Sequence, residues 1–268
     1  MIETTYDTLR GKIHKRTVPE HTNCTLCSCY KNQESEYVSD TLLIETDNFF
    51  LVPQYHGIIP GYVLLSSKRH VNSTAYLNHV EFNELKFMIE VIAQFLNHEF
   101  GFRPIIFEHG SSNSNVKGTV HQHIHFLPIK FTNTDILINE YSLRFLDCLD
   151  DLRVLGKDKD YLYFQNNERK MYFAEDRNNV KNPATESNTL YSLRKHIAEH
   201  FGNQEIFFEP LENYENNIRE TIKMWKSSNN NLMHLLFNIS SGLSVPVVSG
   251  NNVSSPATSF LHGLRVVR

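Results

Sequence analysis

Three histidines occupy alternate positions, His121, His123 and His125, within the stretch GTVHQHIHFLP at residues 118–128. Side chains of a β-strand alternate between its two faces, so residues two apart share a face, about 6.5–7 Å from each other. Apolar residues follow and Pro128 ends the run, which predicts a strand over 119–128. Buried imidazoles need partners, so three of them in register indicate a functional face.

Apolar periodicity predicts both strands and helices before this stretch. Residues 41–70 are rich in aliphatic and aromatic side chains and fit two or three strands, with breaks at 47–48 and 57–61. Residues 80–100 have helical spacing, and Gly101 stands where a C-cap glycine is expected. Residues 103–110 read as another strand.

The pattern changes after Lys130. Helices are expected over 134–150, 187–201 and 213–226, and a hairpin is expected across Asn166-Asn167. A Ser/Asn-rich stretch follows, which predicts a weakly ordered tail. The chain is therefore divided into a catalytic domain at 1–130, an extension packed on it at 131–226, and a tail at 227–268.

Composition excludes several classes of protein. The 268 residues carry a formal charge of −4, which argues against a nucleic-acid polymer as the main partner. The sequence contains no run of about eighteen apolar residues, so no transmembrane helix is expected. The first residues also lack the apolar segment of a secretory signal. Three of the four cysteines lie within six positions, a spacing that suits metal binding better than a disulfide framework. These features indicate a reducing, cytoplasmic location.

Two chemical interpretations of the three histidines are open. They are either a ligand set for a catalytic metal, or a nucleophile with two supporting residues. Neighbours on one strand face do not readily bring three nitrogens within about 2.1 Å of one zinc ion. The spacing therefore favours the nucleophile, and a metal-dependent hydrolase remains the alternative.

Residues 24–128 resemble the histidine triad (HIT) family of nucleotide hydrolases and transferases. HQHIHFL matches its His-x-His-x-His pattern, CTLC at 24–27 matches an upstream CxxC, and GYVLLSSKRH at 61–70 is similar to its Gly-His-x-Leu-x-x-Pro-Lys-x-His strand. Residues 131–226 resemble the C-terminal extension of a longer, bacterial-type branch. The resemblance implies an α+β fold, with a HIT-like antiparallel sheet, a long helix and an α/β extension.

The resemblance also implies a mechanism. His123, the middle histidine, would attack the α-phosphorus of a dinucleoside polyphosphate or another nucleotide conjugate and form a nucleotidyl-imidazole intermediate. Water or an acceptor such as phosphate would then release it. His125 would lie next to the phosphate oxygens and either stabilise charge there or orient the nucleophile. The backbone near His121 would accept a hydrogen bond from the other nitrogen of His123.

Phosphate and ribose contacts are expected from residues near the triad. The candidates are Gly110 and Gly118 through backbone N–H groups, Ser114 and Thr119 through hydroxyls, and His109. The chain departs from the family pattern here, because Glu108 replaces an Asn and Lys117-Gly118-Thr119 replaces a Gly-Gln-Ser segment of many members. Gln54 also stands where many relatives have a ribose-binding Asp. These departures keep open a third interpretation, a nucleotide-binding protein without turnover.

A structural zinc site is implied by the same resemblance. Its ligands would be Cys24, Cys27, His70 and His121, two sulfurs and two nitrogens in a closed tetrahedron. Cys29 is an alternative to Cys24. Family members are often dimers, so a homodimer stays open.

Overall fold

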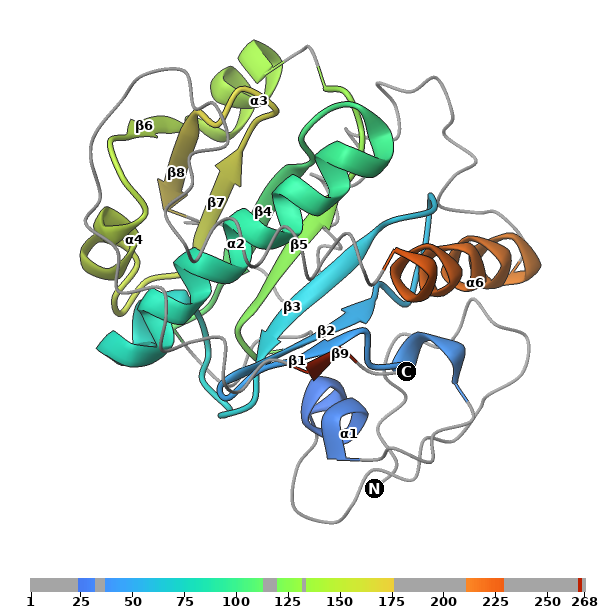
Figure 1. Ribbon diagram of the computed structural model, residues 1–268. Coiled ribbons are helices and arrows are strands. Elements are labelled where there is room, and N and C mark those ends of the chain that lie inside the picture. The colour runs from blue at the N-terminus through green and yellow to red at the C-terminus, as the bar shows by residue number, and fades with distance from the viewer. Residues whose placement is uncertain are drawn as a thin grey trace, which may run out of the picture.

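The computed structural model describes residues 24–31, 37–112, 120–131, 134–175, 211–228 and 265–266. Within these residues, one antiparallel sheet has the strand order β6-β8-β7-β4-β5-β3-β2-β1-β9 (Figure 1). Its strands are β1 Ile44–Glu45, β2 Phe49–Pro53, β3 Val63–Ser67, β4 Ile105–Gly110, β5 His123–Leu127, β6 Arg144–Leu146, β7 Tyr161–Gln165, β8 Met171–Glu175 and β9 Arg265–Val266. The helices are α1 Thr25–Lys31, α2 His79–Phe100, α3 Thr134–Tyr141, α4 Asp150–Leu155 and α6 Leu211–Ser227, with 3-10 turns η2 Val38–Asp40 and η3 Thr74–Tyr76. The predicted α+β fold class is confirmed.

The long helix α2 crosses one face of the sheet (Figure 1). It starts with a capping box, in which the Asn78 side chain accepts from the Glu81 backbone N–H and the Glu81 carboxylate accepts from the Asn78 backbone N–H. It ends at Gly101, whose φ of 78° is left-handed, as the sequence predicted. Apolar residues of α2 such as Phe82 and Phe95 are fully buried against the sheet.

Strand β5 separates its side chains between two environments. Ile124 and Phe126 join the core beneath α2, whereas His125 faces the other way and stacks on Phe107, which belongs to a second apolar cluster. That second face is covered by α3 and, over β2 and β3, by the cluster that contains α1. The histidine strand is therefore buried on both sides, with polar chemistry on one face alone.

Residues after 130 extend the same sheet, because β7 pairs with β4 along its whole length. The predicted hairpin is confirmed as β7 and β8. The predicted helix over 134–150 is wrong: α3 ends at Tyr141, Ser142 has a left-handed φ of 52°, and 144–146 pair with β8 instead. The domain boundaries stay predictions, and the expected helix at 187–201 lies outside the described residues.

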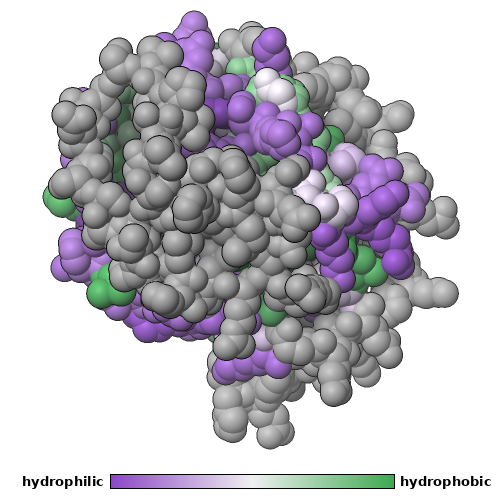
Figure 2. Space-filling model, in the orientation of Figure 1, coloured by the Kyte–Doolittle hydropathy of each residue, from purple (hydrophilic) through white to green (hydrophobic). Residues whose placement is uncertain are grey.

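Helix α6 confirms the helix predicted over 213–226 and packs beside α2. Trp225 is buried and stacks on Phe95, with ring centroids 3.9 Å apart. In Figure 2 hydrophilic side chains gather over α6. Arg219 and Lys223 are among the exposed residues of this helix. Among the described helices, none is both long and apolar enough to cross a membrane.

We predict that Gly110→Ala destabilises the protein strongly. A Cβ at this position would lie 2.1 Å from the ring of Tyr161, which is itself fully buried on β7. Overpacking of a core usually lowers the free energy of unfolding by about 1–3 kcal/mol. Because this contact is so short, we expect a loss of about 3 kcal/mol or more. Urea unfolding measures the loss.

The matched control is Gly101→Ala. Its φ is left-handed, unlike that of Gly110, and a Cβ there meets nothing within 4 Å, so only the backbone penalty of about 1 kcal/mol is expected. An equal or smaller loss for Gly110→Ala than for Gly101→Ala would contradict the packing argument.

Candidate functional site

The three histidines do not form one continuous row. Strand β5 begins at His123, so the expectation that the strand includes His121 is wrong. The physical reason is that the Gln122 backbone N–H donates to the Val71 carbonyl at 2.6 Å, which turns the chain away from the ladder with β3. His121 is thereby directed to the cysteines, while His123 and His125 stay neighbours with ring centroids 4.9 Å apart.

The tautomer of His123 follows from one hydrogen bond. Its Nδ1 lies 2.6 Å from the backbone carbonyl oxygen of His121. A carbonyl oxygen only accepts, so Nδ1 carries the hydrogen and, in the neutral ring, Nε2 keeps its lone pair. The side chain is 8% exposed, so the ring is held in place yet reachable.

His125 lies deeper than His123 and is held by two residues that sequence reasoning missed. Its Nδ1 is 2.8 Å from the Tyr62 hydroxyl, and its ring stacks on Phe107 with centroids 4.4 Å apart and planes 6° from parallel. Phe107 belongs to β4 and Tyr62 directly precedes β3, the two strands that flank β5. One signal was available, because Tyr62 stands where the family pattern GHxL has a histidine.

The predicted metal ligands Cys24, Cys27, His70 and His121 come together, and one ligand atom from each lies within 4.8 Å of the others. The His121 Nδ1 is 3.2 Å from the Cys24 sulfur and 3.4 Å from the Cys27 sulfur, and the His70 Nδ1 is also 3.4 Å from Cys27. In a tetrahedral zinc site a sulfur and a nitrogen ligand are about 3.5 Å apart. These four residues are therefore close enough to hold a metal ion, and Cys29 is not among them.

The protonation of His121 fits a metal ligand. Its Nε2 donates to the Ser67 carbonyl at 2.7 Å, which leaves the Nδ1 lone pair directed at the two sulfurs. Burial, together with the neighbouring His70 and His123, lowers the pKa of His121 to about 4, so the ring is neutral at pH 7. Burial raises the pKa of the Cys24 thiol to about 12, so a bound metal would have to displace that proton.

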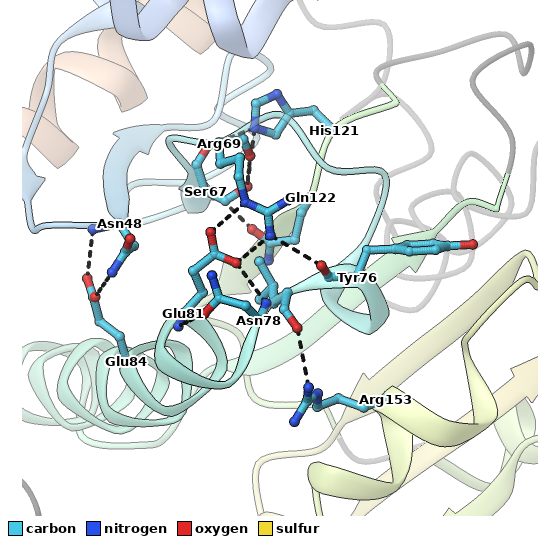
Figure 3. Close-up of polar contacts among 11 residues, drawn as sticks. Asn48, Ser67, Arg69, Tyr76, Asn78, Glu81, Glu84, His121, Gln122 and Arg153 are labelled. Atoms are coloured by element: carbon cyan, nitrogen blue, oxygen red, sulfur yellow. Dashed lines mark hydrogen bonds and ion pairs between the residues drawn. The ribbon is translucent and has the colours of Figure 1, made fainter.

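A polar network ties the segment after β3 to the start of α2 (Figure 3). The Arg69 guanidinium binds the Glu81 carboxylate, with Nε 2.7 Å from Oε1, and Glu81 also caps the Asn78 backbone. The Ser67 carbonyl in the same segment orients His121. Because His70 lies between Ser67 and α2, this network fixes one metal-ligand candidate relative to another.

Glu108 points away from the histidines, toward the α2 side of the sheet. Its carboxylate accepts from the Tyr161 hydroxyl at 2.7 Å and from the Thr74 backbone N–H at 2.9 Å. Burial raises its pKa to about 7, although both hydrogen bonds oppose the shift. Glu108 therefore links β4, β7 and the 3-10 turn η3, and the Asn-to-Glu departure does not place a carboxylate beside His123.

The predicted substrate-binding residues are only partly described. Gln54 is buried just after β2, where its backbone N–H donates to the Tyr62 carbonyl. His109 is half-buried on β4, and Gly110 ends that strand against the Tyr161 ring. Ser114, Gly118 and Thr119 lie outside the described residues. All of these substrate-binding roles stay predictions.

No protein-family model and no curated protein matches this sequence. Solved structures do show similarity. A hypothetical histidine triad nucleotide-binding protein from Sulfolobus tokodaii matches with a TM-score of 0.33 and 19% identity over 39% of this chain and 68% of that one. A HIT family protein from Bacillus anthracis matches with a TM-score of 0.34 and 15% identity over 50% of this chain and 92% of that one.

A HIT family member from Bacillus subtilis is similar as well, with a TM-score of 0.33 and 14% identity over 50% of this chain and 93% of that one. These structures bear the family name that the sequence motifs indicate. Similarities of this size carry no part of the functional argument, which rests on the side chains of the site itself.

We predict that Glu108→Gln changes how stability depends on pH. In the folded protein the pKa of Glu108 is about 7, whereas in the unfolded chain it has its ordinary value near 4.5. Stability therefore falls as pH rises from about 4.5 to 7. A Gln side chain mimics the protonated acid, so the variant should gain about 3 kcal/mol relative to wild type between pH 4.5 and pH 8.

Urea unfolding of both proteins across that range measures the difference. The low pKa of His121 acts in the opposite direction, because the unfolded chain binds its proton first, and it cancels in the comparison. A constant difference at every pH would show that Glu108 does not titrate in this range.

Proposed function

We propose that this chain is a nucleotide hydrolase or nucleotidyltransferase that acts at an α-phosphate through a covalent adduct on His123. The observation that carries the proposal is the hydrogen bond from His123 Nδ1 to the His121 carbonyl, which leaves Nε2 with a lone pair in the neutral ring. The motif resemblance supplies the substrate class, dinucleoside polyphosphates or other nucleotide conjugates.

The proposed reaction has two steps. In the first, the Nε2 lone pair of His123 forms a bond to phosphorus and the bond from phosphorus to the leaving-group oxygen breaks. Positive charge that develops on the imidazole is stabilised by the carbonyl bonded to Nδ1. In the second, an oxygen of water or phosphate forms a bond to phosphorus, and the N–P bond breaks with its electron pair returning to Nε2. The neutral ring is thereby restored, and the proton of an attacking water passes to solvent. Two positioned steps replace one difficult displacement.

The geometry supports a nucleophile over a set of three histidine ligands. His123 commits Nδ1 to a carbonyl, and His121 turns its Nδ1 toward the two cysteines. His125 directs its own Nδ1 to Tyr62. A single metal ion would need all three rings to converge, and their hydrogen bonds direct them to three different partners.

We further propose that zinc binds at Cys24, Cys27, His70 and His121. Two sulfurs and two nitrogens make a closed donor set that suits zinc and leaves no position for a substrate. The ion would supply structural cross-linking: it would join the segment that contains α1 to the residues that flank β3 and β5. A homodimer and a cytoplasmic location remain predictions from the sequence.

We predict that His123→Ala abolishes turnover of every nucleotide conjugate that the wild type cleaves, because the attacking nitrogen is removed. The loss should be at least about 10³-fold. Incubation with a panel of labelled dinucleotides and nucleotide sugars, followed by mass spectrometry of the acid-labile adduct, should locate label on His123 in wild type alone.

The matched control is His98→Ala, which removes an exposed imidazole from the last turn of α2 and should leave turnover unchanged. Wild-type turnover in His123→Ala would refute the nucleophile assignment. Label on another histidine would assign the nucleophile to that residue instead.

We predict one zinc per chain in protein purified under reducing conditions without chelator, measured by elemental analysis. Cys27→Ser should lose most of the metal and lower Tm by about 10 °C, because metal binding stabilises only the folded state. Cys148→Ser is the control, since Cys148 is exposed and lies outside the ligand group. The absence of zinc from wild-type protein would contradict the proposed zinc site.

A further inference from the structure

Tyr62 makes a contact with the site that neither the motif nor the proposed reaction assigns. It is 1% exposed and precedes β3, and its hydroxyl lies 2.8 Å from the His125 Nδ1. The two rings are neighbours, with centroids 5.8 Å apart. His125 in turn lies beside the His123 ring. Tyr62 thus contacts His125, which in turn lies beside the proposed nucleophile.

The chemistry of the two groups decides which one donates. A phenol with a pKa near 10 is a good donor, and the lone pair of a neutral imidazole nitrogen is a good acceptor. The bond is therefore best formed with the Tyr62 O–H donating to Nδ1. A neutral imidazole carries one N–H, so the hydrogen of His125 is then on Nε2.

We propose that Tyr62 is a positioning residue that fixes His125 in its neutral Nε2–H form. In that form His125 offers a hydrogen-bond donor at the nitrogen remote from Tyr62. A phosphoryl oxygen held at His123 would be its acceptor, and this catalytic consequence rests on the proposed function. The two rings then have opposite tautomers: His123 keeps a lone pair on Nε2 for attack, whereas His125 keeps a hydrogen there.

The surroundings hold this arrangement rigid. The Phe107 ring stacks on the face of the His125 ring. Gly61, directly before Tyr62, has a left-handed φ of 87°, and a Cβ there would meet the Phe100 ring at 2.6 Å. The Gly61 backbone N–H donates to the Thr221 hydroxyl at 2.7 Å. Thr221 is buried on α6, so a helix far along the sequence fixes the backbone that carries Tyr62.

The test measures the tautomer of His125 directly. Protein labelled with ¹⁵N-histidine is compared by long-range ¹H–¹⁵N correlation NMR, with the His125 signals identified from their loss in His125→Asn. Wild type should show a protonated Nε2 and an unprotonated Nδ1 for His125. In Tyr62→Phe the donor is missing, so the two tautomers should interconvert and give intermediate, averaged nitrogen shifts.

Tyr163→Phe is the matched control, because it removes a buried phenol from the α2 side of the sheet. It should leave the His125 signals and turnover unchanged. Tyr62→Phe should lower kcat about tenfold on a substrate that wild type cleaves, with KM unchanged, since one positioned hydrogen bond is lost.

A protonated Nδ1 on His125 in wild type would overturn the proposal, as would an identical His125 pattern in Tyr62→Phe. The wild-type measurement does not depend on Tyr62→Phe, so it decides the tautomer even if that variant fails to fold. It also needs no turnover, so failure of the proposed reaction and failure of the Tyr62 assignment are distinguished. An averaged pattern with unchanged kcat would leave the tautomer assignment standing and refute its catalytic role.

Discussion

Gln122 fixes the turn on which the rest of the site depends. Its backbone N–H donates to the Val71 carbonyl, and its own carbonyl accepts from the Ser66 hydroxyl. Its side-chain oxygen accepts from the Ser67 backbone N–H at 3.0 Å, and its side-chain nitrogen donates to the Thr74 hydroxyl at 3.2 Å. Gln122 is fully buried, so these bonds form away from competing water. They hold the start of β5 against the end of β3.

This turn divides the three histidines between two tasks. His121 faces the cysteines, yet its carbonyl oxygen still accepts from His123 Nδ1. One residue therefore contributes its side chain to the metal-ligand group and its backbone to the proposed nucleophile. A shift of the turn would therefore move both the metal-ligand candidate and the carbonyl that holds His123.

Burial on both faces of the sheet makes the polar groups depend on their partners. On the histidine face, His125 is enclosed between Phe107 and Tyr62. On the α2 face, Glu108 is enclosed with Tyr161, and burial raises its pKa to about 7. The strand that carries Tyr161 comes from residues after 130, so the later part of the chain completes the environment of β4. Helix α6 acts similarly through Thr221 and Gly61.

The sequence by itself determined the elements and the ligand group. Periodicity identified α2, the strands around it and the β7–β8 hairpin, because apolar spacing and turn residues are local signals. The resemblance to the histidine triad family, through its CxxC and the histidine that ends its Lys-x-His strand, implied four metal-ligand candidates, and the structure brings those four together. Local signals failed at 134–150, where pairing with β8 overrode helical spacing.

Only the tertiary structure decided how the histidines are used. Alternation along a strand predicted a shared face, but the hydrogen bond from Gln122 to Val71 is a contact across 51 positions that no local pattern reports. The same holds for Tyr62, which reaches His125 from the position directly before β3. Tautomers depend on which acceptor or donor each ring nitrogen meets, and those partners are supplied by folding. The sequence determined that three histidines would lie near one another, and folding gave each of them a different hydrogen-bond partner.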